Sequence, residues 1–462
     1  MAFKLGFVLP FIILLVCRTA LSIDLTVGDA DSTKKATSAI IKNTLTFYTG
    51  DKPGGTPGVL PKPYYWWQAG ALWGGLIEYW SYTGDDTYNK LVTDALLFQI
   101  GPQKNFMPEN VTKEEGNDDQ AFWGFSAMTA AELKFPDPPR KMPSWIALAQ
   151  GVFNSQVTRW DTSTCAGGLR WQIFFTNAGY EYKNVISNGA FFQLAARLAR
   201  YTGNETYSDW ADKMYDWMAS TPNLGSDGQV NDGSNVAKNC TDTNHDQWTY
   251  NYGTMIMGSA YMYSIKKGSE QEKWKTRLSK HLEKFYSTFY PTKYANAPTS
   301  PNIMVEINCE EKRICNPDQT SFKAYTARWL AVTTQLAPFT ASAILPKLRA
   351  SAEGAARQCS GGDGGNWCGQ NWNTGTWDGF RGVGEQMSAL SAIGAPLIEK
   401  SAKPVTAKTG GTSEGDANAG LGGPTAVRMN RITNADRVGA ALLTFLMILC
   451  IIGGALWMIV GD

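Results

Sequence analysis

The feature that most constrains the fold is a helical pattern that recurs along the chain. Residues 68–88 and 187–207 both start with small and aromatic residues at helical spacing, and both end in Tyr-Thr-Gly followed by a Thr-Tyr pair. Looser copies begin near Asp119, Asn251, Ser321 and Phe380, so the copies start at intervals of roughly 50–75 residues. In each copy a turn and a more charged, amphipathic segment follow, so the repeating unit is a helical hairpin.

Neighbouring hairpins bury their apolar faces against each other, and such a stack either stays open as a solenoid or closes into a ring. The first segment of each hairpin contains few Lys or Glu residues, as expected for helices inside a closed ring. We therefore expect residues 23–399 to form an all-α, (α/α)6 toroid of six hairpins, with six inner and six outer helices. No long alternation of apolar and polar residues is present, so we expect β structure to be short and confined to loops.

The start of the chain is typical of a secreted protein. Residues 1–22 combine an early lysine, an apolar run and small residues just before Ile23, which predicts a secretory signal peptide. Six cysteines then lie between the two apolar ends, and the short loops between Cys309 and Cys315 and between Cys359 and Cys368 suggest two local disulfides. Cys165 and Cys240 remain as the third pair, among fifteen pairings that are possible on paper. The N-glycosylation sequons begin at Asn110, Asn204 and Asn239.

The other end of the chain is apolar as well. Residues 438–462 form an almost uninterrupted apolar run with nothing basic beyond it, which favours a removed glycosylphosphatidylinositol (GPI) signal over a single-pass membrane anchor. Residues 400–437 are rich in Gly, Ala, Thr and Ser, which indicates a flexible stalk. Small residues surround Asn418, which we expect to be the attachment residue.

Composition narrows the chemistry. Lys and Arg number 42 and Asp and Glu 41, so the chain has no basic excess that would indicate a nucleic-acid partner. Only two histidines occur, His245 and His281, which excludes three-histidine zinc sites; we expect neither a metal nor a cofactor. Aromatic residues make up 12 % of the chain, a share typical of proteins that stack rings on sugars. Acid and base chemistry is therefore expected from carboxylates.

One pair of carboxylates stands out. Asp118 and Asp119 come at the start of an apolar helix, where both side chains point toward the same end of a ring of helices. The helix N-terminus stabilises one carboxylate, and its charge favours the protonated form of the neighbour. One ionised and one protonated carboxyl are what glycoside hydrolysis needs. The alternative is that the pair only caps the helix.

The starts of the other expected inner helices carry aromatic and polar side chains that suit a sugar-binding site. These candidate substrate-binding residues are Trp66, Trp67, Gln68, Asn188, Tyr250, Asn251, Arg381 and Glu385. For each aromatic residue alone, a place in the core is the safer interpretation. Asn188 and Asn251 are harder to assign to the core, because an amide among apolar neighbours must find a partner.

Four motifs resemble glycoside hydrolase family 76, the endo-α-1,6-mannanases, and within it the fungal GPI-anchored cell-wall members. The motifs are Asn117-Asp118-Asp119, Gly167-Gly-Leu-Arg-Trp171, Tyr182-Lys-Asn-Val-Ile-Ser-Asn-Gly189 and Thr249-Tyr-Asn-Tyr-Gly253. The family's (α/α)6 barrel agrees with the six hairpins. One departure is Gln172, where bacterial hydrolytic relatives tend to carry an acidic residue.

The resemblance implies a retaining mechanism, with Asp118 as nucleophile and Asp119 as general acid/base. It adds Asn117, Trp123 and Trp171 to the residues expected to contact substrate. The implied partners are α-1,6-mannose-containing glycans, GPI-core glycans and cell-wall glucan as acceptor. The implied location is the outer face of the plasma membrane, through the GPI anchor, or the cell wall. The alternative function is a non-catalytic wall protein that binds mannan or GPI glycans at the same site.

Overall fold

The computed structural model describes residues 22–294, 302–362, 364–421 and 434–460. It separates into a body that ends at Leu421 and a second unit that starts at Gly422. The predicted signal peptide, residues 1–22, therefore lies outside the described residues except for its last position, and its presence stays a prediction.

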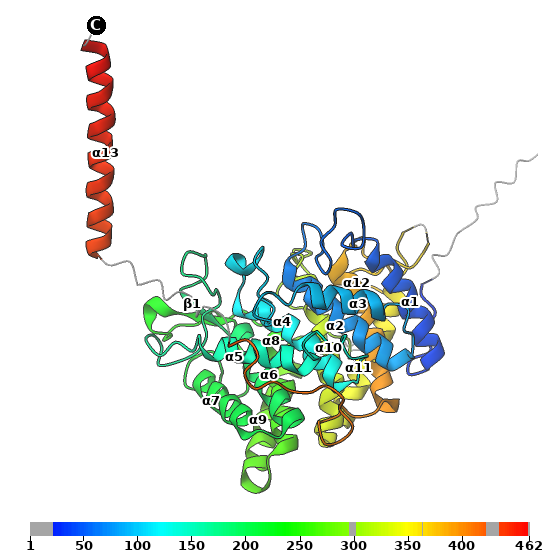
Figure 1. Ribbon diagram of the computed structural model, residues 1–462. Coiled ribbons are helices and arrows are strands. Elements are labelled where there is room, and N and C mark those ends of the chain that lie inside the picture. The colour runs from blue at the N-terminus through cyan, green and yellow to red at the C-terminus, as the bar shows by residue number, and fades with distance from the viewer. Residues whose placement is uncertain (1–21, 295–301, 363, 422–433, 461–462) are drawn as a thin grey trace, which may run out of the picture. The chain divides into compact units, whose positions relative to one another are not determined.

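Six helices form the inner ring of the body, and their labels lie at the centre of Figure 1. They are α2 (Trp66–Thr83), α4 (Asn117–Glu132), α6 (Val185–Thr202), α8 (Thr249–Ile265), α10 (Phe322–Leu336) and α12 (Val383–Gly394). Each packs against the next, and α12 packs against α2, so the ring is closed. The predicted (α/α)6 architecture is confirmed, and all six inner helices begin close to the predicted positions.

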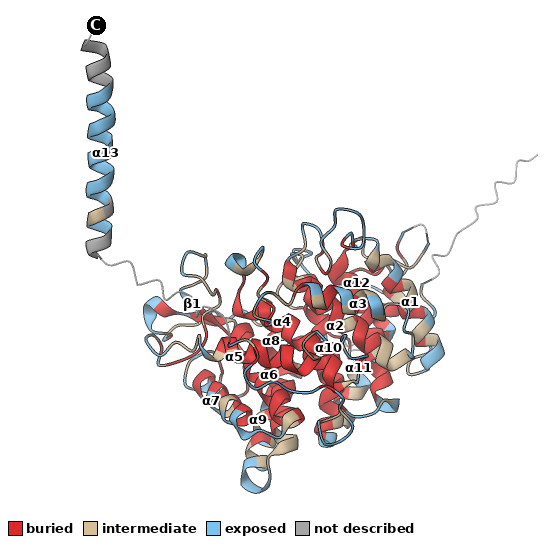
Figure 2. Cartoon of the chain, in the orientation of Figure 1, coloured by how far each residue is buried: buried red, intermediate tan, exposed pale blue. Residues whose placement is uncertain are grey.

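The inner helices are buried along almost their whole length, as the red ribbons in Figure 2 show. Small residues let them approach one another: a side chain at Gly70 of α2 would meet the Trp123 ring of α4 at 2.7 Å. The inner ring is therefore a tightly packed core, and two sizeable cavities lie where the helices begin. We call that end of the barrel the mouth.

Five outer helices follow their inner partners as predicted hairpins. They are α3 (Asn89–Phe98), α5 (Trp145–Val157), α7 (Glu205–Ala219), α9 (Gly268–Phe289) and α11 (Ala341–Gln358). The sixth hairpin was predicted wrongly. The outer helix that packs against α12 is α1 (Ala30–Leu45), from the beginning of the chain. The two ends of the body thus meet to close the ring.

The prediction of a flexible stalk from residue 400 is wrong for its first part. The segment 401–421 lies along the body, and we call it the strap. Hydrogen bonds to its backbone fix it along its length. Val405 N–H donates to Glu132 O at 2.9 Å, and the Asn154 side chain donates to Ala417 O at 2.9 Å and Ala419 O at 2.8 Å. Composition alone missed the strap because it is fixed by its backbone and small residues rather than by apolar side chains. Asn418 lies in this strap and is exposed.

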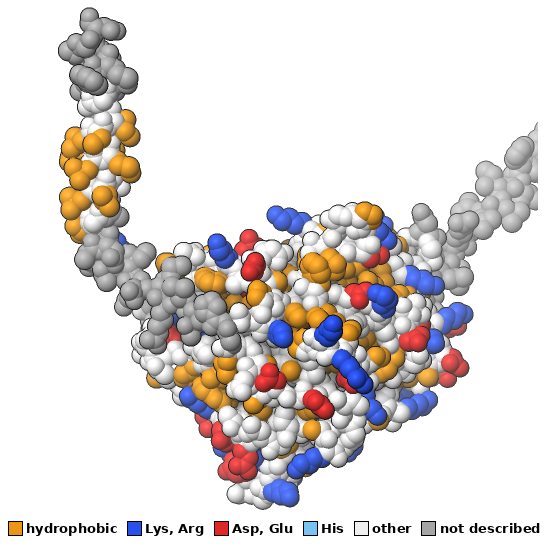
Figure 3. Space-filling view, viewed as in Figure 1, with side chains coloured by type: hydrophobic (Ala, Val, Ile, Leu, Met, Phe, Trp, Pro, Cys, Tyr) orange, Lys and Arg blue, Asp and Glu red, His pale blue; other side chains and the backbone are white. Residues whose placement is uncertain are grey.

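β structure in the described residues is short and lies in loops, as predicted. Strand β1 (Tyr182–Asn184) pairs antiparallel with β2 (Gly233–Asn235). The three expected disulfides, Cys165–Cys240, Cys309–Cys315 and Cys359–Cys368, are all present. The three sequon asparagines are exposed, as glycan attachment requires. The face of the body in Figure 3 carries Lys, Arg, Asp and Glu side chains interspersed, without a basic patch.

The second unit contains α13 (Asn434–Val460). Among the described residues, this helix alone has the length and apolar composition to cross a membrane, with a mean hydropathy of 2.1 over Arg437–Gly454. The composition suits a removed GPI signal and a membrane span equally, so the predicted processing stays a prediction.

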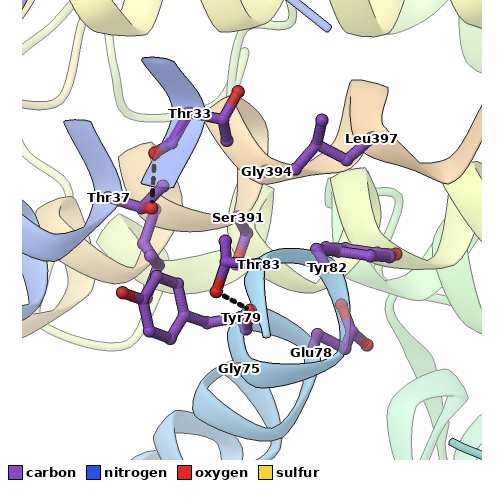
Figure 4. Close-up of a pocket in the computed structure, with 11 residues that line it drawn as sticks. Thr33, Thr37, Gly75, Glu78, Tyr79, Tyr82, Thr83, Ser391, Gly394 and Leu397 are labelled. Atoms are coloured by element: carbon purple, nitrogen blue, oxygen red, sulfur yellow. Dashed lines mark hydrogen bonds between the residues drawn. The ribbon is translucent and has the colours of Figure 1, made fainter. Parts of the chain in front are cut away.

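The end of the barrel opposite the mouth is closed. Figure 4 shows a cavity there between α1, α2 and α12, lined among others by Thr33, Tyr82 and Leu397. Its volume of about 20 Å³ holds about one water molecule. This cavity is too small to hold a sugar.

Candidate active site

The site is built on the first turn of α4, which starts at the mouth. The Asp119 carboxylate accepts the Gly116 N–H at 2.7 Å, and Asp118 accepts the Asp119 N–H at 3.1 Å. A Cβ atom at position 116 would lie 2.3 Å from an Asp118 oxygen, so a larger residue here would displace that carboxyl. Asp119 thus does cap the helix, as the alternative interpretation of the pair proposed. Both carboxyls nevertheless also face open space.

Two adjoining cavities meet at this pair. The first, of about 210 Å³, is lined by Asp118, Asp119 and further side chains from α2, α8, α10 and the loops. The second, of about 310 Å³, extends past Glu114 and Gln172. Four residues line both cavities: Trp67, Asp119, Trp171 and Asp318. Asp119 therefore lies where the two cavities meet, whereas Asp118 lines the first one only.

Acidic side chains dominate the charge of these cavities. Asp118, Asp119, Asp232 and Asp318 line the first cavity, and no Lys, Arg or His is among the described residues that line either one. Aromatic rings form most of the remaining wall, including Tyr250, which stacks on Phe322 with ring centroids 3.7 Å apart. Aromatic faces and unpaired carboxylates are the surfaces that pair with sugar rings and hydroxyls.

Burial without a neighbouring cation changes the protonation of these acids. It raises the pKa of Asp118 well above its usual range, and the negative charge of Asp119 raises it further. Burial also raises the pKa of Asp119 to about 6, although the hydrogen bond from the Gly116 N–H opposes this. Two adjacent carboxyls of this kind share one proton around neutral pH.

The two other acids of the first cavity, Asp318 and Asp232, are shifted in the same direction. Burial, and then the charge of Asp119, raise the pKa of Asp318 to about 6, against a lowering hydrogen bond from the Trp67 side chain. Burial raises the pKa of Asp232, while a 2.8 Å hydrogen bond from the Tyr182 hydroxyl opposes the shift. No group of three His, Cys, Asp or Glu side chains in the described part of the chain is arranged to hold a metal ion.

Trp171 is held in the cavity wall by a rigid loop. The buried Lys183 ammonium donates to three carbonyl oxygens of this loop, those of Asp161, Thr164 and Gly167. The Asn188 side chain pairs with both backbone groups of Leu169, and the Trp171 N–H donates to Tyr182 O at 2.7 Å. The motifs around Trp171 and Lys183 thus form one unit that places an aromatic ring beside Asp119.

The structure brings together part of the predicted site. Asp118, Asp119, Trp67, Trp171 and Tyr250 line the first cavity, and Trp66 lines the second. The other predicted residues line neither cavity, and they lie in two different settings.

Five predicted substrate-binding residues are buried inside the protein: Gln68, Asn117, Trp123, Asn188 and Asn251. The Gln68 amide donates to Pro317 O at 2.8 Å and Asn117 donates to Arg170 O at 2.8 Å, so both hold loops in place. Trp123 stacks on Trp66 in the core. The sequence indicates correctly that the amides need partners. The partners of Gln68, Asn117 and Asn188 include backbone carbonyl groups, whereas the Asn251 side chain hydrogen-bonds to Asp232 and lowers the pKa of that carboxyl.

Arg381 and Glu385 lie at the start of α12 but line neither cavity. The Arg381 guanidinium lies 5.4 Å from the centre of the Trp367 ring and is exposed. Glu385 is buried beside Tyr64 and Gly382, and burial raises its pKa to about 7.

Other cavity residues were missed: Phe122, Tyr182, Asn184, Asp232, Asp318 and Phe322. Asp318 and Phe322 flank the start of an inner helix, so the rule that selected Trp67 and Tyr250 would have found them. Tyr182 and Asn184 lie in one of the four family motifs, but neither residue was assigned a role. Asp232 comes from the segment between α7 and α8 rather than from the start of an inner helix, so no sequence signal marked it.

The family model and the similar proteins all point to the same family. The model of the family described as glycosyl hydrolase family 76 matches residues 32–408. Mannan endo-1,6-alpha-mannosidase DCW1 of Saccharomyces cerevisiae is 44 % identical over 97 % of both chains. A putative mannan endo-1,6-alpha-mannosidase of Schizosaccharomyces pombe is 48 % identical over 87 % of this chain and 88 % of its own.

Solved structures agree with the fold. The crystal structure of Dfg5 from Chaetomium thermophilum in complex with glucosamine superposes with a TM-score of 0.80 at 41 % identity, over 89 % of this chain and 99 % of that one. An alpha-1,6-mannanase of Salegentibacter sp., solved as an inactive variant with alpha-1,6-mannotetrose, gives a TM-score of 0.62 at 18 % identity. That match covers 79 % of this chain and 99 % of the other, and it supports the fold alone.

Proposed function

The chain belongs to glycosyl hydrolase family 76, and from its active-site geometry we propose that it is a retaining endo-α-1,6-mannosidase that also transfers sugars. The observation that carries the proposal is the pair Asp118 and Asp119 at the junction of two aromatic-walled cavities. The names of its relatives in two yeasts, both mannan endo-1,6-alpha-mannosidases, support the substrate class.

In the proposed first step, the Asp119 carboxyl donates its proton to the glycosidic oxygen while the Asp118 carboxylate attacks the anomeric carbon. The bond from that carbon to the leaving oxygen breaks, and a mannosyl ester of Asp118 forms. In the second step the Asp119 carboxylate takes a proton from water or from a sugar hydroxyl. The oxygen that loses this proton attacks the anomeric carbon and releases Asp118, so two inversions give net retention.

The two cavities support this division of roles. Asp118 lines the first cavity only, so we assign that cavity to the sugar whose anomeric carbon reacts. Asp119 lines both, which suits the group that protonates the oxygen between two sugars. The second cavity then holds the leaving group in the first step and the accepting hydroxyl in the second. Burial raises the pKa of Asp118 further than that of Asp119, so the free pair holds its proton on Asp118. The mechanism requires the other arrangement, in which bound substrate favours the ionised form of Asp118 and the proton is on Asp119.

We also propose that the donor is the mannose of GPI-core glycans and that cell-wall glucan is the acceptor. An ester intermediate supports transfer, because a sugar hydroxyl bound in the second cavity competes with water. Secretion by way of residues 1–22 and GPI attachment near Asn418 would place the enzyme at the outer face of the plasma membrane or in the wall. The apolar composition of α13 supports such an anchoring signal.

The test uses the segment 23–421, which includes the strap. It is incubated with an α-1,6-mannan oligosaccharide or a GPI-core glycan, with and without a glucan oligosaccharide, and the products are read by mass spectrometry. Transfer products that vanish in Asp118→Asn support both hydrolysis and transfer. Shorter mannosides without transfer products show that the enzyme only hydrolyses its substrate. Glycan binding without any product would instead support a non-catalytic wall protein.

A further inference from the structure

Asp318 lines the same cavities as the catalytic residues and has no part in the mechanism above. It follows the Cys309–Cys315 loop and precedes α10, so it reaches the site from a different element than Asp118 and Asp119. Its side chain lines both cavities, as does that of Asp119. A group in this position faces the sugars on both sides of the bond that breaks.

The segment that carries Asp318 is held by the start of α2. The Trp67 indole N–H donates to Asp318 Oδ1 at 3.2 Å, and the Gln68 amide donates to Pro317 O at 2.8 Å. Trp67 packs against Phe122, with ring centroids 4.7 Å apart, so the indole has little freedom to move away. The Trp67-Gln68 pair therefore fixes the position of the Asp318 carboxylate.

The environment of this carboxylate is unusual for a structural acid. Asp318 is half-buried, and acids withdrawn from solvent are normally paired with a cation or with several donors. Among the described residues, the Trp67 N–H is the one donor that hydrogen-bonds to the Asp318 side chain, and no cation lines the cavities. The charge of Asp119 disfavours a second carboxylate nearby, so the fold gains no stability from Asp318. Its remaining acceptor sites face the cavities.

We propose that Asp318 is a third active-site carboxyl, which accepts hydrogen bonds from sugar hydroxyls on both sides of the scissile bond and so aligns that bond with Asp118 and Asp119. The proposal rests on the glycosidase reaction proposed above. Trp67 and Gln68 are then positioning residues for Asp318, and Trp67 also offers its ring face to the sugar.

The test is Asp318→Asn. The amide oxygen keeps the hydrogen bond from Trp67, and its N–H groups then face the cavities, where hydroxyl donors need an acceptor. We expect kcat/KM on an α-1,6-mannan oligosaccharide to fall roughly 10- to 100-fold, the usual effect of losing hydrogen bonds to a charged group. Thermal stability should be unchanged or higher, because a repulsive charge is removed. Asp51→Asn, an exposed acid of the same type, serves as the matched control.

Trp67→Phe is a second test of the inference, and it can be carried out even if Asp318→Asn does not fold. It keeps an aromatic ring but removes the N–H donor to Asp318, and we expect a loss in kcat/KM of roughly 3- to 10-fold. Wild-type kcat/KM in Asp318→Asn, or full activity in Trp67→Phe when the first variant does not fold, would overturn the inference.

The failure of the proposed function is a separate result. If the wild-type enzyme turns over no α-1,6-mannoside, binding of the same oligosaccharide is measured through the fluorescence of the cavity tryptophans. Asp318→Asn must then weaken binding at least tenfold, and equal affinity would contradict the role of Asp318. If Asp118→Asn abolishes turnover while Asp318→Asn does not, the glycosidase proposal stands and this inference falls.

Discussion

The carboxylates at the two ends of helix α4 lie in opposite environments. At the closed end, Glu132 of α4 forms a 2.6 Å ion pair with Arg197, and Glu78 of α2 forms a 3.0 Å pair with Arg328. At the mouth, Asp118 and Asp119 of the same helix α4 have no cation beside them in the described cavity wall. Paired carboxylates join helices, whereas unpaired ones keep protons and acceptor sites available for a substrate.

The largest expected effect concerns activity at the mouth. Asp118→Asn removes the nucleophile, so turnover should fall at least about 1,000-fold. The same change removes a buried carboxyl that Asp119 repels, so the melting temperature should stay the same or rise. Activity and thermal unfolding measured on one preparation check both. A variant that loses activity and stability together would mean that Asp118 is structural.

At the closed end we expect the reverse result. Arg197→Met leaves Glu132 buried without its cation, which typically costs about 3–5 kcal/mol of unfolding free energy. Turnover per folded molecule should be unchanged, because 14 residues of helix place Glu132 about 21 Å from Asp118. Urea denaturation and kcat under native conditions measure the two effects. A loss below about 1 kcal/mol would contradict the role of this pair.

The smallest expected effect concerns the pH dependence of the unfolding free energy, to which the carboxyls at the mouth contribute. Burial gives Asp119 and Asp318 pKa values of about 6, above those of an unfolded chain, so the folded state binds more protons between about pH 4 and pH 6. The unfolding free energy contributed by the mouth therefore falls as pH rises through this window. Asp318→Asn removes part of that slope, whereas Asp51→Asn leaves it unchanged. Thermal unfolding at a series of pH values measures the slope, and identical slopes in wild type and Asp318→Asn would contradict the shift.

The sequence predicts the inner ring well, because each inner helix repeats one local pattern of small and aromatic residues. It does not predict that α1 completes the sixth pair, since that contact joins residues far apart in the chain. The strap 401–421 is missed for a related reason: backbone hydrogen bonds hold it, and composition does not record them.

The same distinction applies to the site. Asp118 and Asp119 are predictable because they begin a helix together. Gln68 and Asn188 are predicted to bind substrate. Only the structure shows that their hydrogen-bond partners are Pro317 O and the backbone of Leu169. Asp232 reaches the cavity through a loop whose path depends on tertiary contacts, and no local pattern identifies it.

The most direct test of the account is to trap the intermediate. Asp119→Ala, given an α-mannoside with a leaving group that needs no protonation, should complete the first step and stall at the second, because no base activates water. We predict a stoichiometric mannosyl adduct, located by peptide mass spectrometry on Asp118. An adduct on another residue, or release of product with inverted configuration and no adduct, would contradict the assignment of Asp118 and Asp119 as the retaining pair.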